Sequence, residues 1–210
     1  ERDEAEEALR RIWQRFVPAR NNTNDELVQC LLERDSLASG EPLEAAFRAV
    51  PRIFFVPEPY KERAQIDAPV RIEQLQFNVS APSMHALCLE ALNLQPGERF
   101  LDIGSGVGHV TVLAAKLVGR DGCSHGLEIR EEIRRLGEEN AEAAFETYAE
   151  FLADACRPKF LLRNCFVPDL HGRVYDSIHV GAACQQQLCY QLASSLLAPN
   201  GLMVCPVDDE

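Results

Sequence analysis

The residues best suited to chemistry lie where an apolar segment runs into closely spaced glycines. Residues 100–111 read Phe-Leu-Asp-Ile-Gly-Ser-Gly-Val-Gly-His-Val-Thr, so Asp102 precedes Gly104, Ser105 and Gly106. Glycines at a strand-to-helix turn let the backbone turn tightly and let a ligand approach without a Cβ in the way. Because open α/β sheets bind ligands at the carboxyl ends of their strands, we expect a ligand at this turn.

The spacing of the glycines narrows the ligand class. A dinucleotide fingerprint would require glycine at the sixth position from Gly104, where this chain has His109, and no Gly-Lys-Ser/Thr phosphate loop occurs. The remaining Asp-x-Gly-x-Gly-x-Gly pattern is typical of S-adenosylmethionine sites. The Asp102 carboxylate suits a ligand that carries an ammonium and a sulfonium, whereas it would repel a phosphate. A tight turn without a ligand is the structural alternative.

A second acidic residue, Glu128, follows the glycines by about twenty residues and ends the next apolar segment. An acidic side chain at that place can accept hydrogen bonds from both hydroxyls of a ribose. Taken alone, Glu128 is equally well explained as a solvated acid that caps a helix. Together with the glycine turn and Asp102, it predicts S-adenosyl-L-methionine as the cofactor.

The second half of the chain alternates between strand and helix patterns, which predicts a doubly wound, mostly parallel sheet of the Rossmann-like α/β class. Strands are expected at 99–103, 126–129, 160–162, 177–180 and 202–207, and helices at 110–118, 130–148 and 188–197. Earlier segments have helical periodicity. We therefore expect an N-terminal helix and linker over residues 1–23, a helical cap over 24–75 with Asn24 capping its first helix, and a cofactor-binding sheet over 76–210.

Composition excludes several classes of partner. The net charge of −12 makes nucleic acid a poor partner, because like charges repel. No apolar run approaches the roughly 18–20 residues that span a bilayer, so we expect no membrane partner. None of the eight cysteines forms a Cys-x-x-Cys pair, and no histidine lies at zinc-ligand spacing from a cysteine pair. They therefore indicate free thiols of a reduced, cytoplasmic protein without a metal site.

A family resemblance is carried by residues 80–86. They read Ser-Ala-Pro-Ser-Met-His-Ala, which resembles the Ser-Ala-Pro-x-Met-His-Ala signature of the protein-L-isoaspartate (D-aspartate) O-methyltransferases. Residues 24–28, 49–57, 126–129 and 175–183 also resemble segments of that family, in the same order. The resemblance covers roughly residues 24 to 207. It implies the transfer of a methyl group from S-adenosyl-L-methionine to the free carboxylate of isoaspartyl residues in damaged proteins, a protein-repair activity of a monomer.

The same resemblance assigns roles to individual residues. Ser80 falls at the active-site serine, and Phe77, Asn78, Val79, Ser80 and His85 fall at cofactor-contacting positions. Asp102, Gly104, Ser105 and Gly106 would cradle the methionine part, Glu128 would hold the ribose, and Asn164 and Cys165 would lie against the adenine. From spacing alone, Ser80 is also explained as a plain helix N-cap. Of the other histidines, we expect His109 to be partly exposed and His179 to make a structural hydrogen bond.

Three departures from the family pattern leave alternatives open. Asn164-Cys165 replaces Asp-Gly, and Gln76-Phe-Asn-Val79 replaces Gln-Ala-Thr-Ile. The chain also ends after the fifth predicted strand, so we expect the family's C-terminal strands to be missing. One alternative is a catalytically weak or inactive cofactor-binding module that recognises substrates, as in ubiquitin-ligase adaptors. A small-molecule methyltransferase is a weaker one, because the Ser80 motif argues against it.

Overall fold

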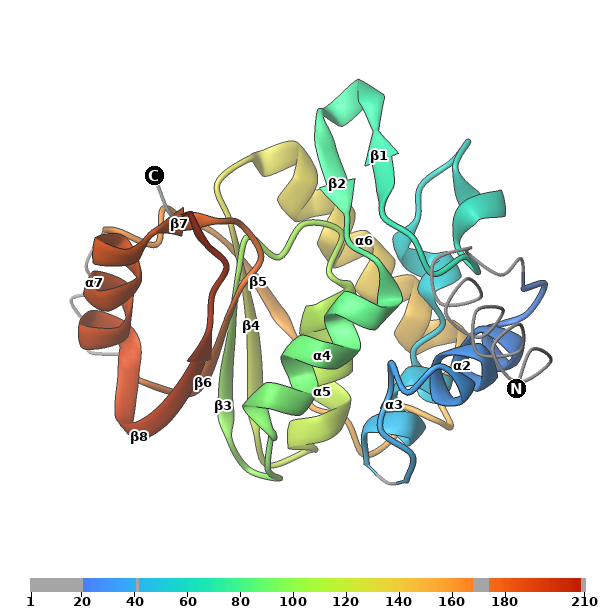
Figure 1. The fold of residues 1–210 in the computed structure, drawn as a ribbon, viewed down its shortest axis with the longest axis horizontal. Helices are drawn as coiled ribbons and strands as arrows, with labels where there is room; N and C mark the ends of the chain where they lie inside the picture. The colour runs from blue at the N-terminus through green and yellow to red at the C-terminus, as the bar shows by residue number, and fades with distance from the viewer. Residues whose placement is uncertain (1–20, 41, 168–173, 209–210) are drawn as a thin grey trace, which may run out of the picture.

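Five parallel strands form the central sheet of this computed structural model, which describes residues 21–40, 42–167 and 174–208 (Figure 1). The strands lie in the order β5-β4-β3-β6-β8. Their bounds are Arg99–Ile103 for β3, Cys123–Glu128 for β4, Lys159–Leu162 for β5, Tyr175–Val180 for β6 and Leu197–Val204 for β8. Chain order therefore reverses between β3 and β6, and such a switch point is where doubly wound sheets form a ligand crevice.

Helices cover both faces of the sheet. Helices α4 (Pro82–Leu92), α5 (His109–Val118) and α6 (Glu131–Thr147) pack on one face, and α7 (Gln186–Leu196) packs on the other (Figure 1). The side chains of β3 alternate accordingly: Phe100 joins the core under α5, whereas Leu101 and Ile103 join the core under α7. The predicted Rossmann-like class is thus confirmed. No helix among the described residues has the length and apolarity needed to cross a bilayer.

Two helices precede the sheet, as expected for a helical cap. These are α2 (Asn24–Glu33) and α3 (Leu43–Ala49), and 3₁₀ turns follow at Arg52–Phe55, Lys61–Arg63 and Glu73–Leu75. Thr23 caps α2 by accepting a hydrogen bond from the backbone N–H of Glu26, so the prediction that Asn24 caps it was wrong. The Asn24 side chain instead donates to the carbonyl of Phe47 on α3. The predicted helix near the N-terminus lies outside the described residues.

A short hairpin joins the cap to the sheet and was not predicted. Strand β1 (Val70–Ile72) pairs antiparallel with β2 (Phe77–Val79), and β2 leads into α4 (Figure 1). Strands of three residues are too short for a readable alternation of apolar and polar positions. The hairpin brings Phe77 and Asn78 to the carboxyl edge of the sheet.

The end of the sheet also differs from the prediction. Strand β8 begins at Leu197 and ends at Val204, whereas 202–207 was expected. Pro206 has no backbone N–H to donate to a ladder, and the chain leaves the central sheet before it. It then forms β9 (Val207–Asp208), which pairs with β7 (Cys184–Gln185) in a separate two-stranded sheet.

Gly137, in the interior of α6, yields a prediction that opposes ordinary helix propensity. Alanine in a helix interior is usually favoured over glycine by about 1 kcal/mol. Here a Cβ would lie 2.8 Å from the Gly106 carbonyl oxygen and 3.2 Å from the Phe160 ring. We expect Gly137→Ala to lower the free energy of unfolding by about 1–3 kcal/mol, the usual cost of overpacking, as measured by urea denaturation. The control Glu139→Ala, at an exposed position of α6, should not destabilise; a stabilised Gly137→Ala protein would contradict the packing.

Candidate cofactor-binding site

The glycine loop, residues 104–108, has a backbone that ordinary residues adopt only with strain. Gly104, Gly106 and Gly108 have φ angles of 77°, 53° and 90°. The backbone N–H groups of Gly104 and Ser105 donate to the carbonyl of Leu127 at 2.8 and 2.9 Å, which fixes the loop against the end of β4. Gly108 then caps α5. The loop therefore lies at the carboxyl edge of β3, as predicted.

Further glycines surround this loop. A Cβ at Gly126 would lie 2.8 Å from the Ser105 side chain, and a Cβ at Gly181 would lie 3.0 Å from the Gly104 carbonyl oxygen. Gly137 approaches from α6, as described above. No role was predicted for Gly137 or Gly181 from the sequence. A glycine in the middle of a long helix pattern was the available signal for Gly137.

Asp102 is buried beneath the loop and is fully engaged by the protein. Its Oδ2 accepts a hydrogen bond from Thr111 Oγ1 at 2.7 Å, and its Oδ1 lies 2.8 Å from His179 Nδ1. Burial lowers the pKa of His179, but the hydrogen bonds and charge interactions with Asp102 and Cys88 together outweigh it, and the pKa rises to about 9. At neutral pH this imidazolium balances the Asp102 carboxylate. The structural hydrogen bond predicted for His179 is confirmed, and Asp102 presents no unpaired charge.

A hollow of about 400 Å³ of free space opens above the loop. Nine of the twelve predicted site residues line it: Phe77, Asn78, Val79, Ser80, His85, Asp102, Gly104, Ser105 and Gly106. Ser105 Oγ is buried there without a hydrogen-bond partner among the described residues. A buried hydroxyl in this state favours a ligand with a polar group. The size, the missing Cβ atoms and this hydroxyl fit the methionine part of S-adenosylmethionine.

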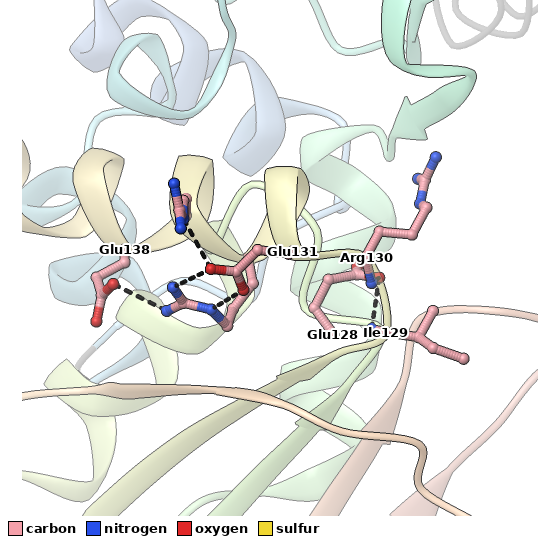
Figure 2. A network of polar contacts seen from close by, with 7 residues as sticks. Glu128, Ile129, Arg130, Glu131 and Glu138 are labelled. Carbon is pink, nitrogen blue, oxygen red and sulfur yellow. Dashed lines mark hydrogen bonds and ion pairs between the residues drawn. The ribbon is translucent and has the colours of Figure 1, made fainter.

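Glu128 lies at the end of β4, outside the lining of the hollow (Figure 2). Its Oε1 accepts hydrogen bonds from the backbone N–H groups of Ile129 and Arg130 at 2.8 and 3.1 Å. Both hydrogen bonds that the described residues donate to the Glu128 carboxylate are accepted by Oε1. That arrangement holds the side chain in one orientation and leaves the acceptor capacity of Oε2 unused by the described residues.

Arg130 joins this end of β4 to the hairpin, a role that the sequence analysis missed. Its Nη1 donates to the Leu75 carbonyl at 2.6 Å, and its guanidinium lies 5.8 Å from the centroid of the Phe77 ring. Next along α6, Glu131 accepts hydrogen bonds from two arginines, one of which also reaches Glu138 (Figure 2). These ion pairs are at the surface, where they contribute little stability.

His85 and His109 form a buried pair between α4 and α5. Their Nδ1 atoms lie 3.1 Å apart, and His109 Nε2 lies 3.3 Å from the Val50 carbonyl oxygen. The prediction that His109 is partly exposed was therefore wrong, because the helical cap covers the start of α5. Burial lowers the pKa of His109 to about 3 and lowers that of His85 well below its usual range. Both imidazoles are neutral at pH 7, so one Nδ1 donates and the other accepts.

Ser80 does not cap α4. The N-cap residue is Ala81, and the backbone N–H of Ser83 donates instead to Asp67 Oδ1 at 2.9 Å. This overturns the structural alternative for Ser80, which lines the hollow. Its carbonyl accepts a hydrogen bond from Nη2 of the buried Arg52 at 3.0 Å. Arg52 also donates to the carbonyls of residues 63, 64, 66 and 68, so it orders the whole segment that presents Ser80.

Asn164 and Cys165 follow β5, whose Leu162 pairs with Glu128, and they lie away from the nine residues of the hollow. Asn164 is exposed, and its Oδ1 accepts a hydrogen bond from the backbone N–H of Phe166 at 3.0 Å. Cys165 lines a second, apolar hollow together with Leu101 and Tyr175. Neither residue lines the hollow above the glycine loop. Their contact with adenine stays a prediction.

The strand order, the glycine loop after the central strand and the crevice at the switch point together define the class of protein. This is a Rossmann-like α/β fold of the S-adenosylmethionine-dependent methyltransferase type.

Comparison with known proteins narrows the class to a family. The sequence model of the protein-L-isoaspartate(D-aspartate) O-methyltransferases matches residues 22–156, and the chain belongs to this family. It is 31% identical over 208 residues to protein-L-isoaspartate O-methyltransferase 1 of Arabidopsis thaliana, an alignment that covers 95% of this chain and 82% of that protein. A Triticum aestivum protein-L-isoaspartate O-methyltransferase is 33% identical over 186 residues, with 88% and 77% covered.

A solved structure agrees with this assignment. A Plasmodium falciparum protein assigned to the protein-L-isoaspartate O-methyltransferases, in complex with S-adenosyl-L-homocysteine, superposes with a TM-score of 0.75. Its sequence is 26% identical, and the match covers 90% of this chain and 86% of that one.

The buried Arg52 guanidinium donates hydrogen bonds through both Nη1 and Nη2, which predicts that lysine cannot replace it. A lysine has one ammonium group and cannot reach both the Ile66 carbonyl, 2.9 Å from Nη1, and the Ser80 carbonyl, 3.0 Å from Nη2. We expect Arg52→Lys to lower the free energy of unfolding by at least about 2 kcal/mol, because buried carbonyls lose their donors. Arg63→Lys is the matched control, because Arg63 is exposed and its side chain donates to the Pro69 carbonyl. Equal stability of the two variants would argue against the role of Arg52.

The buried imidazoles predict a loss of stability in acid. The pKa values of His85 and His109 in the folded chain lie below the unfolded value of about 6.5, so below that pH only the unfolded chain takes up protons. We expect the free energy of unfolding to fall by up to about 1.4 kcal/mol per pH unit for each imidazole as the pH drops below about 6.5, and for His109 this continues to about pH 3. Urea denaturation at a series of pH values measures this slope.

His179 contributes with the opposite sign. Its folded-state pKa of about 9 is raised, so its stabilisation is fully present below about pH 6.5 and is lost as the pH rises through about 9. NMR titration of the histidine ring protons distinguishes the contribution of His179 from those of His85 and His109. A His109 resonance that titrates near the ordinary value would contradict its burial as a neutral imidazole.

Proposed function

We propose that this chain transfers a methyl group from S-adenosylmethionine to the free carboxylate of L-isoaspartyl and D-aspartyl residues in damaged proteins. One observation carries the proposal: the Ser80 segment, which is specific to the family, lines the same hollow as the glycine loop. Membership of the family and the likeness to a relative bound to S-adenosyl-L-homocysteine support the cofactor.

The proposed cofactor contacts follow the layout of the site. The methionine part would lie over Asp102–Gly106, where the backbone can be approached closely and Ser105 Oγ can make its missing hydrogen bond. Glu128 Oε2 would accept from the ribose hydroxyls, and Asn164 and Cys165 would flank the adenine. When bound, the cofactor supplies an electrophilic methyl group on a sulfonium.

The reaction requires no general base from the protein. The substrate carboxylate has a reference pKa near 3.5–4 and is already ionised at pH 7. The protein must orient that carboxylate and remove water from it, and orientation can contribute up to about 7–11 kcal/mol. We propose that the Ser80 hydroxyl donates a hydrogen bond to the substrate carboxylate. The Arg52 guanidinium acts through the Ser80 carbonyl as a positioning group.

The setting of the protein is also a proposal. We propose a protein that acts as a monomer in the cytoplasm on protein substrates, without nucleic acid or membrane partners. The eight cysteines are all unpaired, as expected in a reducing compartment.

The decisive experiment is transfer of a labelled methyl group to an isoaspartyl peptide and to the matched aspartyl peptide. We expect the isoaspartyl peptide alone to be methylated. Ser80→Ala should reduce kcat/KM roughly 10–100-fold, the effect of one hydrogen bond to a charged group, with little change in cofactor affinity measured by calorimetry. Ser83→Ala, three residues along, is the control and should behave as the wild type.

Two outcomes would contradict the proposal. Equal methylation of both peptides would exclude isoaspartyl specificity. Tight cofactor binding without any turnover would exclude the activity and favour the alternative of a substrate-recognition module.

A further inference from the structure

Three cysteines that are apart in the sequence bring their sulfur atoms together at the end of the sheet. Cys184 belongs to β7, Cys189 to the first turn of α7, and Cys205 follows β8. The Sγ–Sγ distances are 3.1 Å for 184–189, 3.4 Å for 184–205 and 3.0 Å for 189–205. We call these three residues the thiol cluster.

The backbone holds the thiol cluster in place. The N–H of Cys184 donates to the Pro206 carbonyl at 3.1 Å, and β7 pairs with β9 directly beyond Cys205. Each cysteine therefore lies on a segment with its own hydrogen bonds. Cys189 is buried, whereas Cys184 and Cys205 are half-buried and leave the cluster accessible to a small ion.

The cluster is not a disulfide. Bonded sulfurs lie about 2.05 Å apart, and all three cysteines are free thiols. A single disulfide would use two of the sulfurs and leave the third beside it. The three sulfur atoms are therefore in close contact without a covalent bond.

We propose that the thiol cluster binds a soft, thiophilic cation, Zn²⁺ or Cu(I), through three thiolates. The metal forms three metal–sulfur bonds, and the three thiols release three protons to solvent. Thiolates are the ligands that select these two ions. Sulfurs at about 2.3 Å from a tetrahedral zinc lie about 3.8 Å from one another, so the cluster must open by less than about 1 Å. A water molecule completes tetrahedral coordination for Zn²⁺, and Cu(I) needs no fourth ligand.

The local charge favours a cation. Residues 174–208 contain no lysine or arginine, and Asp208 of β9 lies in the strand that pairs with Cys184 and Gln185. No cationic side chain of this segment therefore competes with a metal for the thiolates. The expectation that the cysteines have no metal role rested on sequence spacing, which cannot show that β7, α7 and the end of β8 meet.

The site is distinct from the cofactor hollow, although the two are connected through the chain. Gly181 lines the hollow, and β7 begins three residues later. None of the three cysteines lines the hollow. A bound metal would link β7, α7 and the end of β8, so it would stabilise this end of the sheet without taking part in methyl transfer.

The test is a metal titration of the full chain, freed of metal with a chelator and kept reduced with a phosphine. We expect one Zn²⁺ or one Cu(I) to bind per chain, measured by competition with a chromophoric chelator for each ion. Cd²⁺ serves as a spectroscopic probe, and we expect one Cd²⁺ per chain with the ultraviolet absorption of cadmium thiolates. Cys189→Ser should weaken binding at least 100-fold. Cys30→Ser, on α2 and outside the cluster, should bind as the wild type.

A second measurement needs no variant. Alkylation followed by peptide mass spectrometry should show that bound Zn²⁺ or Cu(I) protects Cys184, Cys189 and Cys205 and leaves Cys30 reactive. Protection by one ion but not the other identifies which of the two the site takes. Dissociation constants no tighter than about 10 µM for both ions, or protection of other cysteines, would overturn the proposal.

Discussion

The buried carboxylate of Asp102 is the interaction on which the site depends. It accepts a hydrogen bond from Thr111 on α5 and pairs with His179 on β6, so one side chain of β3 joins three elements at the switch point of the sheet. An unpaired carboxylate in this place would cost several kcal/mol. Because both partners are present, β3 can carry a buried charge directly before the glycine loop. The loop is therefore fixed through Asp102 on one side and through the Leu127 carbonyl on the other.

Close backbone approach is the second constraint, and it explains why the glycines are spread over the chain. The loop leaves no room for a Cβ at Gly126 on β4, at Gly137 on α6 or at Gly181 after β6. These residues are distant in sequence, but each faces the same turn. A methyl group at any of them would displace the backbone that shapes the hollow, so the cofactor site is set by packing as much as by polar groups.

The sequence predicts the features that depend on residues close together in the chain, and it misses those that depend on residues far apart. Strand 99–103 and the helix after it were predicted correctly because the glycine turn and the apolar periodicity are local signals. The burial of His109 was not, because it depends on a cap that folds back from distant residues. The role of Arg52 and the meeting of the cysteines were missed for the same reason: each requires segments that only the tertiary fold brings together.

The departures from the family pattern fall on different parts of the site, which decides what they can affect. Ser80, Asp102 and the glycine loop follow the pattern, and they line the hollow where the methyl group would be presented. Phe77, Asn78 and Val79 depart from the pattern and line the same hollow. Asn164 and Cys165 lie outside it, at the proposed adenine end. Contacts to adenine are the same before and during methyl transfer, so weakening them raises KM without lowering kcat. On the proposed layout, the substitutions at Asn164 and Cys165 would change how tightly the cofactor is held. Those at Phe77, Asn78 and Val79 would instead act beside Ser80, where the methyl group would be presented.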